Sequence, residues 1–138
     1  MDLSLHLGAS TVVSIALLGI LLFLLGANVT RHRAQRGGTG NQMPTDPADR
    51  MFIAIRAHGN ATEYVPTLIV LLLVCDVLAD GWWVAALAVA AFVSRLLHAV
   101  GMLTSATLAS HGPLRDIGAM GTYVTGVALG VTAIVAGV

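Results

Sequence analysis

The sequence predicts an all-α membrane protein, an antiparallel bundle of four transmembrane helices, and three observations lead to this fold. Hydrophobic residues make up 57% of the chain and charged residues only 10%, whereas a soluble domain carries about 25% charged residues. Residues 7–27 and 117–138 contain no charge, and each stretch is long enough to cross a bilayer as a helix of about 20 residues. Between them, residues 51–77 and 81–106 are apolar apart from scattered polar residues.

We expect the four helices at about 5–29, 51–78, 81–106 and 114–137, so that one transmembrane domain fills residues 1–138. The first helix could be mistaken for a signal peptide. However, Asp2 stands where such a peptide carries basic residues, and the apolar run that follows is too long. We therefore expect this helix to be retained as a membrane span.

The basic residues are unevenly distributed, and their distribution predicts the orientation in the membrane. All seven are arginine, and five of them fall in the first loop or just after the third helix: Arg31, Arg33, Arg36, Arg50 and Arg115. By the positive-inside rule, both termini lie outside and loops one and three lie in the cytoplasm. A chain with arginine as its only basic residue type and rich in Ala, Val and Gly is typical of GC-rich bacteria, so we expect a bacterial inner membrane. The expected partners are membrane lipids, and no nucleic acid.

Three further features bear on helix ends and packing. Asp46 or Asp49 is expected to cap the second helix. Gly126 and Gly130 form a GxxxG pattern, which allows close contact between helices. Cys75 has no second cysteine to pair with and lies among apolar residues, so we expect it to be a packing residue.

Polar residues gather on one face of each central helix, although ionisable groups inside a bilayer are costly. At about 100° per residue, the side chains of Arg56, Asn60 and Glu63 fall within about 60° of arc, and His58 points roughly the other way. On the third helix, Arg95 and His98 share a stripe in the same manner.

Counting residues from the expected helix ends predicts which of these residues meet. Glu63 lies about 18 Å and Arg95 about 16 Å from the same membrane surface, at about 1.5 Å per residue. We therefore expect Glu63 and Arg95 to approach each other, directly or through one water or ligand group.

A buried structural ion pair between these two residues is one interpretation. The other is an anion site, because Arg56 and Arg95 outnumber Glu63 by one and arginine binds carboxylates with two parallel hydrogen bonds. A metal site on His58 and His98 is disfavoured, since the two side chains face different directions and no third ligand has suitable spacing. We expect no metal.

The run Arg56-Ala57-His58-x-Asn60-x-x-Glu63-Tyr64-x-Pro66 resembles the helix-two signature of the membrane-associated proteins in eicosanoid and glutathione metabolism (MAPEG), of the bacterial type. Arg95-x-x-His98 resembles the helix-three motif of that family, and Pro113-Leu114-Arg115 resembles a Pro-x-Arg near the start of its helix four. The similarity covers four spans in the same order over essentially the whole chain.

The resemblance implies a homotrimer that binds glutathione, or another low-molecular-weight thiol, between subunits near the cytoplasmic side. The residues implied to contact the thiol are Arg56, Asn60, Glu63, Tyr64, Arg95 and His98, with Arg31 or Arg33 from the end of helix one. His58 would face the adjacent subunit. Arg115 resembles the arginine that holds the glutathione sulfur as a thiolate.

The leading hypothesis is a glutathione-dependent transferase or peroxidase that acts on lipophilic electrophiles, small molecules that arrive through the membrane. The alternative is a non-catalytic lipid-binding or scaffold protein of the same fold. Met102 favours that alternative slightly, because it stands where relatives often carry a tyrosine. A small ion carrier that uses Glu63 and His98 is disfavoured, because the outer half lacks charged residues to complete a path.

Overall fold

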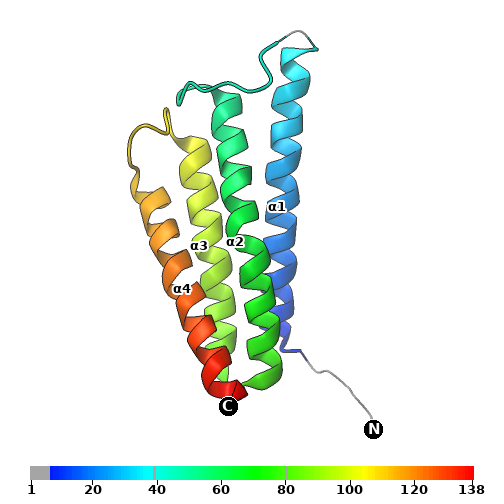
Figure 1. Ribbon diagram of the computed structural model, residues 1–138, viewed down its shortest axis with the longest axis vertical. Coiled ribbons are helices and arrows are strands. Elements are labelled where there is room, and N and C mark those ends of the chain that lie inside the picture. Colours follow the sequence, from blue (N-terminus) through cyan, green and yellow to red (C-terminus); the bar gives the residue numbers. More distant parts are fainter. Residues whose placement is uncertain (1–6, 39, 80) are drawn as a thin grey trace.

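The computed structural model describes residues 7–38, 40–79 and 81–138, and these form four long helices without a strand (Figure 1). Helix α1 spans Ala9–Arg36, α2 Arg50–Leu78, α3 Trp82–Thr104 and α4 Pro113–Gly137. All four are long and apolar enough to cross a membrane. Together with the composition, this identifies an integral membrane protein.

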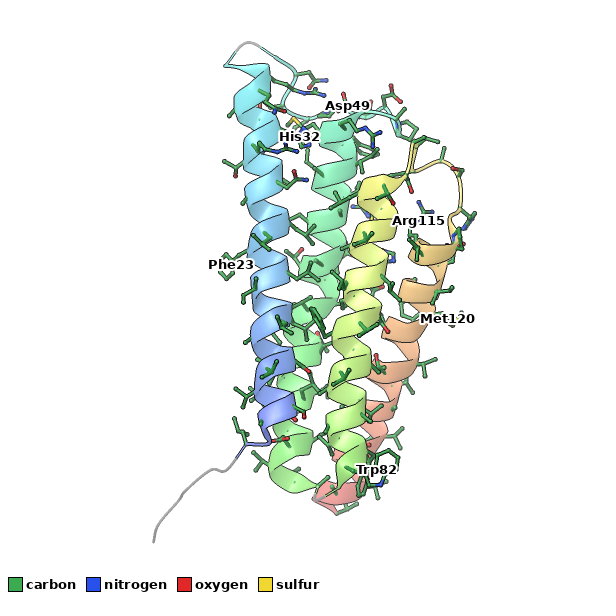
Figure 2. The ribbon with its side chains drawn as sticks, turned by 180° about the vertical axis from the view of Figure 1, so that it is seen from behind. Phe23, His32, Asp49, Trp82, Arg115 and Met120 are labelled. Carbon is green, nitrogen blue, oxygen red and sulfur yellow. The ribbon has the colours of Figure 1, made fainter. Side chains whose placement is uncertain are left out.

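The helices run antiparallel, with the α1–α2 and α3–α4 loops at one end and the short α2–α3 connection at the other (Figure 1). Helices α2 and α3 contact each other, and both also contact α1 and α4. Over the described residues, α1 and α4 do not touch each other. The hairpin of α2 and α3 is therefore the centre of the subunit, and Phe23 of α1 and Met120 of α4 point away from it on opposite sides (Figure 2).

The end of α1 differs from the prediction. We expected the helix to end at about residue 29, but it continues to Arg36 and stops at Gly37, whose φ of 65° is the left-handed conformation that suits glycine. Arg31 and Arg33 therefore lie on a helix and not in a loop. The expected start at about residue 5, like Asp2 and Asp80, lies outside the described residues.

Helices α3 and α4 pack backbone against backbone at glycines. A Cβ added at Gly118 would lie 2.3 Å from the His98 nitrogen, and one at Gly101 would lie 2.4 Å from the Arg115 nitrogen. The predicted Gly126–Gly130 pair does not make this contact, because a Cβ at Gly130 would meet nothing within 4 Å. Close packing inside the subunit depends on Gly101 and Gly118, and contact of the Gly126–Gly130 pattern with a neighbouring subunit stays a prediction.

At the end that carries the two longer loops, an ion pair and several hydrogen bonds hold the loops together. Asp49 caps α2 by accepting hydrogen bonds from the Met51 and Phe52 amides, as predicted, and it also pairs with Arg36. The hydrogen bond from Arg36 lowers the pKa of the Asp49 carboxyl. Arg50 donates to the Ser105 carbonyl at 3.0 Å, which ties the start of α2 to the α3–α4 loop.

At the opposite end, Asp76 of α2 holds the start of α1. Its carboxylate accepts hydrogen bonds from the Gly8 amide at 2.8 Å and from the Thr11 hydroxyl at 2.5 Å. A negative charge at a helix N-terminus is favourable, because the helix dipole is positive there. Asp76 therefore fixes the α1 N-terminus to the α2–α3 hairpin.

Candidate functional site

Arg95 is the centre of the candidate site, and it lies in the buried stripe of α3. Ala88, Ala91, His98 and Ala99 belong to the same stripe. The Arg95 side chain is only 1% exposed, so the fold places a long cationic side chain where a core residue would normally pack. The guanidinium has to find its partners on the facing helix.

Those partners come from α2 and, beyond it, from α4. The Arg95 Nη2 donates to the Asn60 Oδ1 at 2.7 Å, and the Arg95 Cζ lies 5.4 Å from the centre of the Tyr64 ring. Guanidinium groups stack favourably on aromatic faces at this distance. The Tyr64 hydroxyl is in turn 3.4 Å from the Tyr123 hydroxyl of α4. We call Asn60, Tyr64, Arg95 and Tyr123 the Arg95 cluster.

The charge of Arg95 has no carboxylate partner within 4 Å among the described residues. Its Nε is buried and has no hydrogen-bond partner in the part of the chain that the structure describes. A buried charge normally needs a counter-charge or a full set of hydrogen bonds, because desolvation is costly. The Arg95 cluster is therefore a desolvated cationic centre with capacity to bind an anion or another acceptor.

The expected direct pairing of Arg95 with Glu63 is wrong. Glu63 is exposed on the surface of the subunit, and Arg95 reaches Asn60, three residues earlier on α2. Contact through a water or a ligand group stays a prediction. The face of α2 that meets Arg95 was predicted correctly, since Asn60 lies on the same polar face as Glu63. The position along α2 was predicted about one turn too far from the start of the helix.

Arg56, Asn60 and Glu63 together form an open face beside the buried Arg95. Arg56 and Glu63 are exposed and Asn60 is half-buried. Arg56 and Arg95 provide two cations against the single carboxylate of Glu63. A single subunit would cover only one side of a ligand bound on this face.

His98 and Arg115 lie at the α3–α4 contact. His98 is 7% exposed, and its Nδ1 donates to the Arg115 carbonyl oxygen at 2.8 Å. Arg115 lies near the start of α4 (Figure 2), and its Nη1 donates to the Leu108 carbonyl at 3.3 Å. The residue also borders a hollow of about 160 Å³. In the free subunit His98 thus holds the backbone of α4, and the Arg115 guanidinium is turned to the α3–α4 loop.

His58 lies apart from these groups, on the other side of α2. It borders a cleft of about 450 Å³ between α1 and α2, together with Gly26, Thr30 and Arg33. Arg31 instead donates to the Asn28 side chain at 3.0 Å. Of the two arginines considered at the end of α1, Arg33 is the one that shares a cleft with His58. Contact of His58 with a neighbouring subunit stays a prediction.

Two polar residues with a structural position of note were missed by the sequence reasoning. Tyr123 lies in an uncharged stretch, and only its spacing of four residues from Ala119 and three from Met120 marks it as part of a helix face. Asp76 follows Cys75 near the end of α2, where it resembles an ordinary end-of-span charge. Neither belongs to a recognisable motif, so the tertiary contacts were needed to find them.

Within the described ranges, no group of three or more His, Cys, Asp or Glu side chains could hold a metal ion. Among curated protein sequences, none gives a significant match to this chain. The model of the MAPEG family matches residues 11–135, which contain α2 and α3, nearly all of α1 and α4, and every residue of the candidate site. The chain is therefore a member of the MAPEG family.

Proposed function

We propose that this protein is a glutathione-dependent transferase or peroxidase of the membrane, acting on lipophilic electrophiles. Membership of a family whose members generally use glutathione supports this function. The observation that carries it furthest is the Arg95 cluster, a buried cation without a carboxylate partner within 4 Å among the described residues, next to the open face of Arg56, Asn60 and Glu63. Glutathione offers two carboxylates for the arginines and one amino group for Glu63.

The chemistry requires the thiol as a thiolate. A thiol with a pKa of about 8.5 is mostly protonated at neutral pH, and a cation or donor near the sulfur favours loss of its proton to solvent. In a transfer reaction the thiolate sulfur bonds to an electrophilic carbon and a leaving group such as chloride departs. In a peroxidase reaction two thiols are oxidised to a disulfide, while a hydroperoxide is reduced to an alcohol and water.

Arg115 is our candidate for the residue that stabilises the thiolate. It is the cation that α4 carries into the same half of the bundle as Arg56. Among the described residues its guanidinium makes one hydrogen bond, at 3.3 Å to the Leu108 carbonyl, which it would have to give up. The α3–α4 backbone contact at Gly101 fixes the position of the Arg115 backbone. Reorientation of its side chain towards a bound thiol would therefore need no movement of the helix.

We further propose a homotrimer with C3 symmetry that binds the thiol between subunits. The open position of Arg56 and Glu63 supports this arrangement, because one subunit covers only one side of the polar face. The cleft beside His58 and Arg33 would be the second place where an adjoining subunit or thiol carboxylate could fit.

For the orientation, we propose that both termini lie outside and that the α1–α2 and α3–α4 loops lie in the cytoplasm of a bacterial inner membrane. Arg31, Arg33, Arg36, Arg50 and Arg115 all lie at the end of the bundle with the two longer loops, which supports this choice.

The test compares Arg115→Ala with Arg56→Ala in purified, detergent-solubilised protein. Arg56→Ala should weaken glutathione binding by about tenfold to a hundredfold, the effect of losing a charge-assisted contact of about 1.5–3 kcal/mol. Arg115→Ala should leave binding closer to wild type, but it should reduce the ultraviolet absorbance of bound thiolate and the turnover of a chlorinated aromatic substrate. If Arg115→Ala changes neither quantity, Arg115 is not the activating residue.

A non-catalytic lipid-binding protein is the second candidate, favoured by Met102, which is buried on α3 four residues after His98 and provides no hydrogen-bond donor. Thermal stabilisation separates the two functions, because a ligand stabilises the protein that binds it. Stabilisation by glutathione, with consumption of glutathione above background, supports the enzyme. Stabilisation by a fatty acid alone supports the lipid binder.

A further inference from the structure

A hollow lies at the end of the bundle where α1 begins and where α2 connects to α3. Its volume is about 290 Å³, and it is bordered by Gly8 and Thr11 near the start of α1, Asp76 of α2 and Val84 of α3. Trp82 marks the same end of the bundle (Figure 2) and is 82% exposed, as expected for a tryptophan at the surface of a membrane. The hollow therefore lies near the head groups of one leaflet.

An apolar groove between α1 and α3 continues from this hollow. The two spaces share Ala9 and Ser10, and the groove has a volume of about 440 Å³. Its residue Leu17 lies eight residues after the start of α1 (17 − 9), and Val93 lies eleven after the start of α3 (93 − 82). At about 1.5 Å per residue, the groove therefore reaches about 12–16 Å from this end of the bundle. We call the hollow and the groove together the α1–α3 site.

The carboxylate of Asp76 gives the α1–α3 site a negative charge at its surface end. Each of its oxygens accepts one hydrogen bond, from the Gly8 amide and the Thr11 hydroxyl, whereas an ionised carboxylate has about four acceptor positions. Among the described residues, no basic side chain lies within 4 Å of it. The seven basic residues of the chain are arginines within residues 31–56 and at positions 95 and 115. Because a half-buried charge is stabilised by a counter-charge, this end of the site favours a cationic group.

We propose that the α1–α3 site binds one phospholipid with an ethanolamine head group, taken from the leaflet at this end of the bundle. The ammonium group carries three N–H donors, as in lysine, and donates to the remaining acceptor positions of Asp76. One acyl chain lies in the groove along Leu17, Val89 and Val93. None of the residues that border the site belongs to the Arg95 cluster, so the inference is independent of the thiol-dependent function.

The head group determines which phospholipid fits. A choline head group carries the same positive charge but has no N–H to donate, and a glycerol head group has no cation. Charge-assisted hydrogen bonds are about twice as strong as neutral ones, so Asp76 should select ethanolamine from a mixture of lipids with identical chains.

The depth of the groove favours a lipid over a helix of a partner protein or of a second copy. The groove reaches about 12–16 Å from the end of the bundle, which is about half of the ~30 Å hydrocarbon core. An acyl chain of one leaflet occupies that half, whereas a transmembrane helix would need a contact surface across the whole core.

Val89 and Val100 provide a matched pair of substitutions on α3. Val89 borders the groove and is 49% exposed, whereas Val100 is 40% exposed and lies outside the groove. They are eleven residues apart (100 − 89), about three helical turns, so they lie on nearly the same face of α3 at different depths. Val89→Phe fills part of the groove, and Val100→Phe makes the same change elsewhere on this face.

A second pair of substitutions separates lipid binding from the attachment of α1. Asp76→Asn removes the charge that attracts the ammonium group. Thr11→Val removes one hydrogen bond to Asp76 but keeps the carboxylate. Both variants weaken the contact between α2 and the start of α1, and only Asp76→Asn should remove the selection for ethanolamine.

The first measurement is native mass spectrometry of the purified protein in detergent, titrated with phosphatidylethanolamine or phosphatidylcholine of identical chains. Wild type should bind one phosphatidylethanolamine per subunit about tenfold more tightly than phosphatidylcholine, as expected for one charge-assisted hydrogen bond. Asp76→Asn should bind the two lipids about equally, and Thr11→Val should keep the preference. Val89→Phe should weaken binding of both lipids about fivefold or more, and Val100→Phe should match wild type. Equal affinity of wild type for the two lipids would overturn the proposal, as would a preference that Asp76→Asn retains.

The second measurement locates the lipid. A phosphatidylethanolamine with a diazirine in one acyl chain is photolysed with the protein in phosphatidylcholine nanodiscs, and labelled peptides are mapped by mass spectrometry. We expect labels within residues 9–17 and 84–93, which unlabelled phosphatidylethanolamine displaces and added phosphatidylcholine does not. Val89→Phe should reduce these labels and Val100→Phe should not. Labels confined to other segments would refute the site, and labels spread over every helix without displacement would show an adventitious lipid only.

Discussion

The backbone contact between α3 and α4 leads to a graded prediction for three glycine-to-alanine substitutions. In Gly118→Ala, the new Cβ would lie 2.3 Å from the His98 nitrogen and 2.7 Å from the Ser94 carbonyl oxygen. Ordinary contacts begin at 3.4 Å, so the helices have to separate locally by up to 1.1 Å (3.4 − 2.3). Both obstructing atoms belong to the α3 backbone, which cannot rotate away.

The expected free energy of unfolding follows from two opposing terms. Overpacking of a tight contact costs about 1–3 kcal/mol, while replacement of a helical glycine by alanine gains about 1 kcal/mol of helix propensity. Gly118→Ala should therefore destabilise the protein by up to about 2 kcal/mol. Gly121→Ala meets the Ser94 Oγ, a side-chain atom that can rotate, and should cost less. Gly130→Ala meets nothing and should be neutral or slightly stabilising.

The assay is equilibrium unfolding in mixed micelles with increasing sodium dodecyl sulfate, followed by circular dichroism. The order of midpoints should be Gly118→Ala below Gly121→Ala below Gly130→Ala. Because separation of the helices also lengthens the His98–Arg115 hydrogen bond, Gly118→Ala should lower turnover at temperatures where it is still folded. Equal midpoints for Gly118→Ala and Gly130→Ala would show that α3 and α4 do not meet at this register.

Three further predictions concern charged residues. Asp49→Asn keeps a capping side chain but loses the ion pair with Arg36. The hydrogen bond from Arg36 lowers the Asp49 pKa below 3.8, so the stabilisation from this ion pair is complete above that pH and is lost as the pH falls through the depressed pKa. Melting curves of wild type and variant should therefore differ at pH 7 and converge in strong acid. Asp76→Ala should destabilise the start of α1 by about 1 kcal/mol, as for loss of an N-cap, and hydrogen exchange at Thr11 and the following amides should accelerate while exchange in α4 stays unchanged. Arg95→Lys should weaken glutathione binding about tenfold or more, because an ammonium group cannot both donate to the amide and stack on the ring, and isothermal titration with a binding constant equal to wild type would contradict this role.

The number and order of the helices could be predicted from the sequence, because apolar stretches of sufficient length allow few other structures in a bilayer. The end of α1 could not be placed by the same signal. Hydropathy marks the part of a helix that lies in hydrocarbon, whereas α1 continues for seven more residues, from residue 30 to Arg36, through polar residues such as Arg31 and Gln35. The helix ends at Gly37, a glycine in the left-handed conformation. The end of the apolar stretch does not mark this position.

The same uncertainty in helix ends explains the error at Arg95. Helix α2 begins one residue earlier than expected, at Arg50, and α3 ends two residues earlier, at Thr104. Counted from these ends, Arg95 is nine residues deep (104 − 95) and Asn60 is ten (60 − 50), which is the pair that the structure brings together. Polar faces were thus predictable from helical periodicity, while the pairing depended on boundaries that the sequence does not specify.

As far as the structure describes the chain, α2 and α3 each contact both flanking helices, and α1 and α4 do not touch each other. This arrangement has a consequence for biogenesis. Helix α1 contains the most apolar 18-residue stretch of the four helices, with a mean hydropathy of 2.5, and can enter the bilayer alone. Helix α3 carries Arg95, whose insertion in isolation would be costly, but the acceptor Asn60 lies on α2. The two can enter as a hairpin that already satisfies part of this charge, before α4 has been synthesised. Helix α4 then docks on the surface that α2 and α3 already form, with glycines at its contact with α3.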